Sequence, residues 1–308
     1  MSMPKEPERR DLLRLGAAFA VSALIPPAFA ATPAQHMRTI PKSGETLPAI
    51  GLGTWQTFDV GNAATDRAGP REVLRLFVDQ GGRVIDSSPM YGKSESVVGD
   101  LAADTGTAGK LFLATKVWTR GREDGIRQME ESFRRLRTNR MDLMQIHNLL
   151  DWKAHIKTLR DWKAQERIRY IGITHYTESA YDDLAHIIET EDIDFVQFNY
   201  SIASRAAEQR LLPLALEKRV AVLVNKPFEK AGLFDKVRDK PLPPWATEAD
   251  CASWAQFFLK FVLSHPAVTC AIPATRNPKH LLDNMQAGLG RLPDSTLRNK
   301  MAELVQRL

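Results

Sequence analysis

Short apolar runs alternate with longer amphipathic stretches along most of this chain. Near-continuous apolar runs are typical of strands that are covered on both faces, and apolar residues that recur every three or four positions predict helices. The predicted strands are 49–53, 83–86, 111–116, 141–147, 168–174, 194–198, 220–224 and 268–272. The predicted helices are 70–80, 94–103, 122–138, 153–166, 178–189, 206–218, 248–264 and 278–287.

Eight strand–helix units in about 250 residues predict a closed (β/α)8 barrel, a TIM barrel of class α/β. The segment 39–48 predicts a β-hairpin ahead of the first strand, and 288–308 predicts an extra C-terminal helix outside the barrel. We therefore expect a single barrel domain over residues 31–308. The alternative is an open doubly wound sheet, but Gly51-Leu52-Gly53 does not complete the G-x-G-x-x-G turn expected there.

The first thirty residues form a different kind of segment. A charged start with Arg9-Arg10 precedes an apolar stretch over 15–29, which ends at Ala28-Phe29-Ala30. This order predicts an export signal peptide that is removed, and the stretch is too short for a permanent membrane anchor. The arginine pair followed by Leu12-Leu13 resembles a twin-arginine signal, and a general secretory signal is the alternative. We expect a periplasmic protein that the twin-arginine export machinery carries across in folded form.

Composition narrows the remaining classes. The 308 residues are 44% hydrophobic and 26% charged, with a formal net charge of +5. The two signs are interspersed, and no basic run is interleaved with aromatic residues, so nucleic acid is not an expected partner. No metal-ligand spacing stands out. Cys251 and Cys270 could pair in an oxidising compartment, although Cys270 lies within an apolar strand pattern and fits a buried position.

Polar residues occupy the ends of three consecutive predicted strands. Asp86, Lys116 and His147 end them, and Tyr91 follows in the next loop after Asp86. In a barrel these ends form the active face. A lysine cation stabilises a phenolate and is expected to lower the pKa of the Tyr91 phenol, while Asp86 keeps the lysine charged. This set suits protonation of a carbonyl oxygen, and because no side chain supplies hydride, a nicotinamide is implied.

These segments resemble the aldo-keto reductase family. Val84-Ile85-Asp86-Ser87-Ser88-Pro89-Met90-Tyr91-Gly92 is similar to the segment that holds the family's catalytic Asp and Tyr. Ala114-Thr115-Lys116-Val117-Trp118 resembles the segment with its Lys, and Met144-Gln145-Ile146-His147 the one with its His. The resemblance extends over about residues 38–287 and implies reduction of an aldehyde or ketone with Tyr91 as general acid.

The resemblance also implies a nicotinamide cofactor across the barrel mouth, NADP(H) in preference to NAD(H). The chain departs from the family at three cofactor positions, which hold His175, Asn225 and His280. Lys226 could compensate at the pyrophosphate, and Arg276 could grip a 2′-phosphate through its bidentate fork. The implied cofactor-binding residues are Thr54, Thr174, His175, Gln197, Lys226, Thr275, Arg276, Asp283 and Asn284, with Asp86 near the nicotinamide ribose.

Aromatic and sulfur side chains are expected around the same mouth. Trp55, Met90 and Trp118 fall in loops beyond strand ends and could line an apolar pocket for a small carbonyl substrate. Two other functions fit the same residues. One is a lyase in which Lys116 forms a Schiff base, and the other is a non-catalytic dinucleotide-binding subunit that senses redox state.

Overall fold

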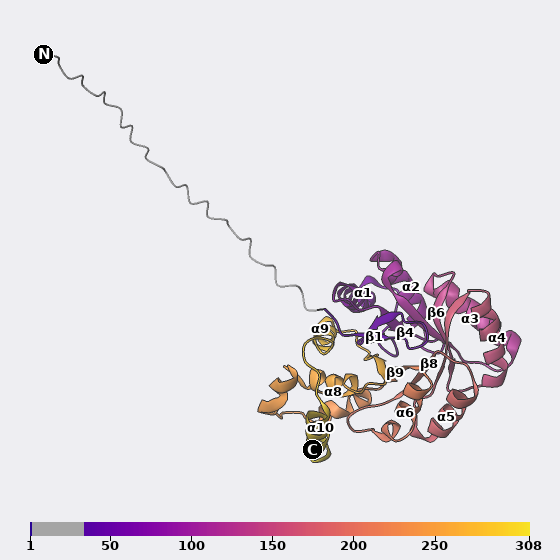
Figure 1. Ribbon diagram of the computed structural model, residues 1–308. Coiled ribbons are helices and arrows are strands. Elements are labelled where there is room, and N and C mark those ends of the chain that lie inside the picture. The colour runs from indigo at the N-terminus through magenta and orange to yellow at the C-terminus, as the bar shows by residue number, and fades with distance from the viewer. Residues whose placement is uncertain (2–33) are drawn as a thin grey trace. The chain divides into compact units, whose positions relative to one another are not determined.

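The computed structural model describes Met1 and residues 34–308, and the latter belong to one compact unit. The predicted signal peptide therefore lies almost wholly outside the described residues. Eight parallel strands form one sheet, surrounded by helices (Figure 1). The strands are β3 (Leu52–Gly53), β4 (Val84–Asp86), β5 (Phe112–Val117), β6 (Met141–His147), β7 (Ile168–Thr174), β8 (Phe195–Asn199), β9 (Ala221–Asn225) and β10 (Val268–Ala271).

The sheet closes between its first and last strands. Parallel bridges pair Ile50 with Ala271 and Gly53 with Ala274. The Ala271 amide donates to the Ala49 carbonyl at 2.9 Å across this seam. Gly53 allows the close approach, because a Cβ there would lie 2.8 Å from the Ile272 carbonyl oxygen. The (β/α)8 barrel is confirmed, and the open-sheet alternative is wrong for this chain.

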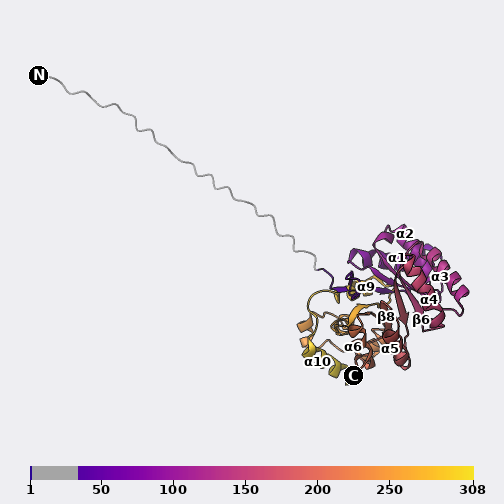
Figure 2. The same cartoon turned by 45° about the vertical axis from the view of Figure 1, so that its right-hand side comes forward.

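Helices form the outer layer of the barrel, and Figures 1 and 2 show them arranged round the strands. Their apolar faces pack on the strands in one continuous core. The longer ones are α1 (Ala64–Asp79), α2 (Ser94–Asp104), α3 (Arg122–Leu136), α4 (Trp152–Ala164), α5 (Tyr181–Thr190), α6 (Leu211–Glu217), α8 (Trp254–Leu263), α9 (Pro278–Gln286) and α10 (Ser295–Gln306). The extra C-terminal helix expected over 288–308 is α10.

A second core fills the inside of the barrel. The predicted hairpin forms from β1 (Met37–Thr39) and β2 (Thr46–Pro48), which pair antiparallel. Its Ile40 and Leu47 join the inward-facing Phe112 and Tyr170 in this core. The hairpin thereby covers the end of the barrel at which the strands begin, and the opposite end, at which they finish, is left for a site.

Helix α1 begins six residues earlier than the predicted residue 70. Pro70 thus lies inside the helix, although proline removes a backbone donor from a helix interior. Tertiary contacts hold the preceding turn in place. Arg67 donates to the Gly61 carbonyl at 3.2 Å and to the Asp100 carboxylate at 2.8 Å. These contacts lie in the first turn of the helix, ahead of Pro70.

The predicted helix 248–264 is also shorter than expected. Helix α8 begins at Trp254, with Ser253 as its N-cap accepting from the Gln256 amide at 3.1 Å, and Asp250 is left-handed. The preceding loop contains an unpredicted short helix, α7 (Gly232–Lys236), and a 3-10 turn over Pro244–Ala249. Hydrophobic periodicity alone does not reveal such short turns.

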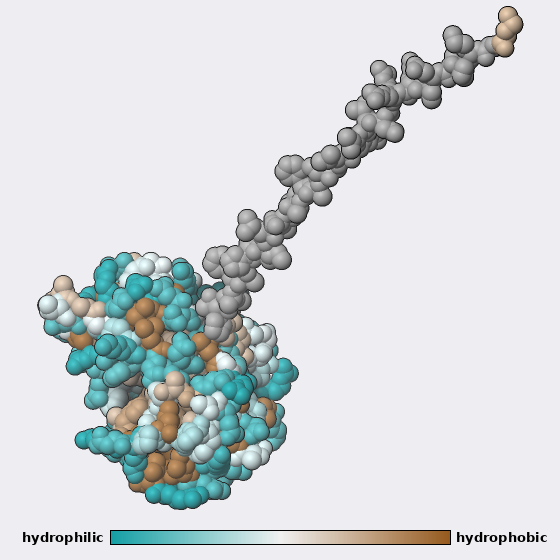
Figure 3. Space-filling model, turned by 90° about the vertical axis from the view of Figure 1, so that its left-hand side faces the viewer, coloured by the Kyte–Doolittle hydropathy of each residue, from teal (hydrophilic) through white to brown (hydrophobic). Residues whose placement is uncertain are grey.

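On the face shown in Figure 3, hydrophobic side chains form patches separated by polar ones. Within residues 34–308 no helix is long and apolar enough to cross a membrane. Cys251 and Cys270 are both free and buried, so they do not pair. Cys270 belongs to the barrel interior, as its apolar surroundings in the sequence indicated.

Candidate active site

The four expected catalytic side chains meet at the carboxyl ends of neighbouring strands. Asp86 ends β4, Lys116 lies in β5 and His147 ends β6. The Lys116 Nζ donates to the Asp86 carboxylate at 2.6 Å and lies 5.0 Å from the centroid of the Tyr91 ring. The His147 ring packs edge-on against Tyr91 at 5.8 Å. Residues 86, 91, 116 and 147 therefore form one cluster.

Asp86 is held by donors on every side. Its second carboxylate oxygen accepts from the Gln145 amide at 2.9 Å and from the Gln197 amide at 3.0 Å. Lys116 also donates to the Ser87 carbonyl at 2.7 Å. Gln145 is a site residue that the strand-end pattern does not predict. It lies two residues before His147 and thus on the same inward face of β6, and a glutamine in an apolar run was the available signal.

Lys116 is fully buried and charged. Burial by itself lowers the pKa of its ammonium, but the facing Asp86 carboxylate and the Tyr91 phenol outweigh it and raise the pKa above the usual range. A Schiff base needs a neutral amine. The ion pair with Asp86 therefore opposes the lyase alternative.

The pKa of Tyr91 differs from the expectation. Burial of the phenol raises its pKa, the Lys116 charge lowers it, and Asp86 raises it again, so the net direction is upward. The sequence argument counted the lysine and left out desolvation, which penalises a phenolate in a closed site. The Tyr91 phenol thus holds its proton at neutral pH, and Lys116 acts by stabilising the phenolate that proton transfer would leave.

His147 is an uncharged imidazole. Burial lowers its pKa to about 2, and the Lys116 and His175 charges act in the same direction. Its Nδ1 lies 3.0 Å from the Ser88 Oγ, and its ring lies 6.3 Å from that of Trp118. His147 therefore serves as a hydrogen-bonding group and not as a cation at any pH near neutral.

We expect this neutral His147 to make the protein less stable in acid. The folded-state pKa lies below the usual 6.5, so the unfolded chain binds the proton more tightly. The stabilisation is complete above pH 6.5 and falls by about 1.4 kcal/mol per pH unit below it. Urea unfolding of the wild type and His147→Gln between pH 7 and 5 measures this pH dependence. The free energy of unfolding should fall less for the variant than for the wild type. Equal slopes for the two proteins would contradict it.

The residues implied for the nicotinamide end line the same mouth. The Thr174 hydroxyl donates to the Gln197 side-chain carbonyl at 3.2 Å, and the Thr54 hydroxyl bonds to the Asp86 carbonyl at 3.0 Å. The His175 ring stacks on Tyr176 at 5.5 Å. Asn225, in place of an aromatic residue, has a buried side-chain oxygen with no partner among the described residues. An unsatisfied acceptor there fits a ligand that brings a donor, such as a carboxamide.

Of the residues implied for the phosphate and adenosine end of the cofactor, some are hydrogen-bonded to other side chains and Arg276 is not. Arg276 lies just ahead of helix α9. It is exposed, and its guanidinium makes no hydrogen bond within residues 34–308. Lys226 donates to the Tyr176 carbonyl at 3.0 Å. Asp283 is bonded to Ser253 and Gln256 of the α8 start. Thr275 and Asn284 are buried, and Thr275 accepts from the Asn277 amide.

Three large apolar side chains stand exposed at the mouth. The exposed fractions are 39% for Trp55, 39% for Met90 and 40% for Trp118, whereas the neighbouring His147 side chain is buried. Single exposed apolar side chains are common on protein surfaces, so these three are informative only because all of them follow strand ends at one mouth. The Trp118 ring lies 6.3 Å from that of His147, and Met90 directly precedes Tyr91, which agrees with the expected apolar pocket.

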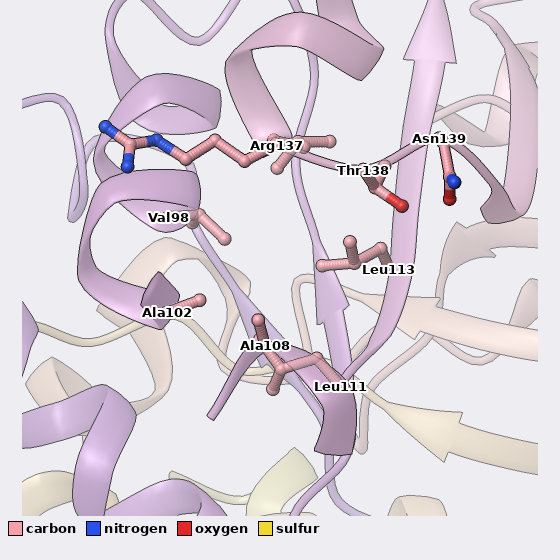
Figure 4. A pocket seen from close by; sticks show the side chains of 9 residues that line it. Val98, Ala102, Ala108, Leu111, Leu113, Arg137, Thr138 and Asn139 are labelled. Carbon is pink, nitrogen blue, oxygen red and sulfur yellow. The ribbon is translucent and has the colours of Figure 1, made fainter. Parts of the chain in front are cut away.

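The hollow shown in Figure 4 lies away from this cluster. It has a volume of about 500 Å³ and sits near the starts of β5 and β6. Val98 and Ala102 reach into it from α2 and face Leu111 and Leu113. It contains no titratable group apart from Arg137, whose guanidinium points away. Among the described residues, no cluster of three metal-ligand side chains occurs.

A closed parallel barrel with a buried lysine–aspartate pair and a tyrosine at its mouth defines a barrel oxidoreductase. The chain belongs to the Aldo/keto reductase family, whose pattern matches residues 49–300. It is 31% identical over 257 residues to Methylglyoxal reductase YeaE of Escherichia coli (strain K12), covering 81% of this chain and 88% of that protein. It is 26% identical over 252 residues to Glyoxal reductase of Bacillus subtilis (strain 168), covering 79% and 83%.

A solved structure agrees with this assignment. The aldo/keto reductase from Klebsiella pneumoniae in complex with NADP and acetate superposes with a TM-score of 0.72 at 27% identity. The match covers 87% of this chain and 95% of that chain. Both the sequence relatives and the solved structure thus extend across the barrel.

Proposed function

We propose that this protein reduces an aldehyde or ketone to an alcohol with NADPH as the hydride source and Tyr91 as the proton donor. The observation that carries the proposal is the Tyr91 phenol beside the buried Lys116–Asp86 pair, 2.6 Å across, at an aromatic barrel mouth. A protonated phenol next to a fixed cation suits transfer of one proton to a carbonyl oxygen.

The chain's own residues perform the acid half of the reaction. The carbonyl oxygen accepts a hydrogen bond from the Tyr91 hydroxyl and another from His147, which polarises the carbonyl and orients it. As negative charge develops on that oxygen, the Tyr91 proton moves to it. The phenolate that remains faces the Lys116 ammonium, which Asp86 holds in place. A proton from solvent then restores the phenol.

NADPH, when bound, supplies the hydride that adds to the carbonyl carbon. Thr174, Gln197 and the unsatisfied Asn225 oxygen would hold its carboxamide end, and Arg276 with Lys226 would hold its phosphates. The complex of the Klebsiella pneumoniae relative contains NADP, which supports this choice over NAD.

Purified protein tests the proposal through NADPH oxidation with a panel of aldehydes and ketones. Small 2-oxoaldehydes come first, because related proteins are named methylglyoxal and glyoxal reductases. We expect turnover that depends on both the carbonyl and NADPH. Tight NADPH binding without turnover on any member of the panel would refute it and favour the redox-sensing alternative.

We expect Arg276 to set the preference for NADPH. Its side chain is exposed and unengaged, and a bidentate guanidinium suits a 2′-phosphate. Arg276→Met should weaken NADPH binding about tenfold, or about 1.4 kcal/mol, and leave NADH binding unchanged. Titration of cofactor fluorescence measures both constants. Arg238→Met is the control, and an equal loss for NADH would contradict a 2′-phosphate contact.

We also propose that residues 1–30 send the folded protein to the periplasm through the twin-arginine machinery. The support is the order Arg9-Arg10, apolar stretch, Ala28-Phe29-Ala30. Replacing both arginines with lysine should keep the protein in the cytoplasm. If the variant were still exported, a general secretory signal would be the better account.

A further inference from the structure

Ser88 is a buried hydroxyl in direct contact with the imidazole of the active site. It lies in the loop after β4, between Asp86 and Tyr91, and it is fully buried. Its Oγ lies 3.0 Å from the His147 Nδ1, and the Met90 amide donates to the same Oγ at 3.4 Å. No other hydrogen bond reaches this hydroxyl from residues 34–308.

The hydrogen-bond count around Ser88 admits one consistent arrangement. A neutral imidazole has one donor nitrogen and one acceptor nitrogen, and a hydroxyl has one hydrogen to donate. If the His147 Nδ1 carried the proton, the Ser88 oxygen would accept from both Nδ1 and the Met90 amide. The Ser88 hydrogen would then be buried without an acceptor, which is unfavourable. If Ser88 donates to Nδ1 instead, every group is satisfied.

We infer that Ser88 fixes the tautomer of His147, so that Nδ1 is bare and Nε2 carries a proton directed at the carbonyl oxygen of the substrate. This rests on the proposed carbonyl reduction and gives Ser88 a positioning role. The Nε2 atom makes no hydrogen bond to the described residues and is not among their fully buried polar atoms, so a ligand can reach it.

The alternative tautomer would be unproductive at this site. A bare Nε2 presents a lone pair to the carbonyl oxygen, and the two acceptors repel each other. With the proton on Nε2, the carbonyl oxygen receives two donors, Nε2–H and the Tyr91 hydroxyl. Because burial and Lys116 keep His147 neutral, protonation cannot supply the second N–H, and the tautomer alone decides.

The first test observes the tautomer directly in the protein without cofactor. Nitrogen NMR distinguishes protonated from bare imidazole nitrogens, and His147→Gln identifies the signals among the seven histidines. We expect wild-type His147 to have its proton on Nε2 at neutral pH. A proton on Nδ1 would overturn the inference, and this result does not depend on whether the protein reduces carbonyls.

The second test compares Ser88→Thr with Ser88→Val, two side chains of the same shape that differ by the hydroxyl. We expect kcat for an aldehyde to be about tenfold lower in the valine variant than in the threonine variant, with NADPH affinity equal. The nitrogen NMR spectrum of Ser88→Val should show a mixture of the two His147 tautomers. Thr190→Val is the control for loss of a distant hydroxyl.

Equal kcat for the threonine and valine variants would overturn the positioning role. Absence of carbonyl reduction in the wild type would instead refute the proposed function, and the NMR result would still decide the tautomer. The two failures are therefore distinguishable.

Discussion

Tyr91→Phe should lower kcat for carbonyl reduction by about 10²–10⁴-fold, the range that a positioned general acid contributes. The substitution removes the phenolic proton and little else, because the ring packs edge-on against His147 and can still do so. NADPH affinity and thermal stability should stay close to those of the wild type. Stopped-flow measurement of NADPH oxidation under single-turnover conditions isolates the chemical step from product release.

Tyr176→Phe provides a matched control for this substitution. It removes another phenol at the mouth, from a ring that stacks on His175, and it leaves the Lys116–Asp86 pair untouched. We expect its single-turnover rate to stay within a few-fold of wild type. If Tyr91→Phe retained the wild-type rate, the acid would be another group and the proposed mechanism would be wrong.

Lys116→Met should abolish turnover and destabilise the fold by about 3–5 kcal/mol. The ammonium is completely buried, and its removal leaves the Asp86 carboxylate without its cation. Gln145 and Gln197 would still donate to that carboxylate, but amides do not neutralise its charge. Urea unfolding at pH 7 measures the loss, and the activity assay measures the catalytic effect.

The double variant Lys116→Met with Asp86→Asn separates the loss of stability from the loss of activity. Removing both charges leaves no unpaired ion, so the stability should recover by more than half while activity stays absent. Arg75→Met removes a cation from exposed ion pairs with Glu72 and Asp79 and should leave the free energy of unfolding nearly unchanged. A double variant less stable than Lys116→Met would contradict the account of the buried pair.

The sequence alone determined the barrel and predicted Tyr91 as its acid. Strand and helix periods are local properties, so eight units could be counted, and the polar residues that end three adjacent strands identified Asp86, Lys116 and His147. Register then required these ends to meet, because parallel strands place their carboxyl ends at one face. The segments around Tyr91 and Lys116 resemble those of the aldo-keto reductases and thereby indicated the family.

The first residues of helices α1 and α8 were predicted less well than the strands. Helix α1 begins six residues before Pro70, in a turn where Arg67 is anchored to Asp100, 33 residues further along the chain. The start of α8 was displaced by a left-handed Asp250 and the Ser253 cap. The Arg67–Asp100 contact joins distant segments that no window of the sequence contains, whereas the Ser253 cap is a local contact that hydrophobic periodicity does not reveal.

Tertiary structure alone decided the electrostatics of the site. From sequence, Lys116 was expected to lower the pKa of Tyr91, yet burial prevails and raises it. The amides of Gln145 and Gln197 on Asp86, and the Ser88 hydroxyl on His147, come from different strands and loops. Desolvation and hydrogen-bond direction depend on what surrounds a group in three dimensions. The sequence thus predicts Tyr91 as the acid, and only the fold determines the direction of its pKa shift and the partner of the His147 Nδ1.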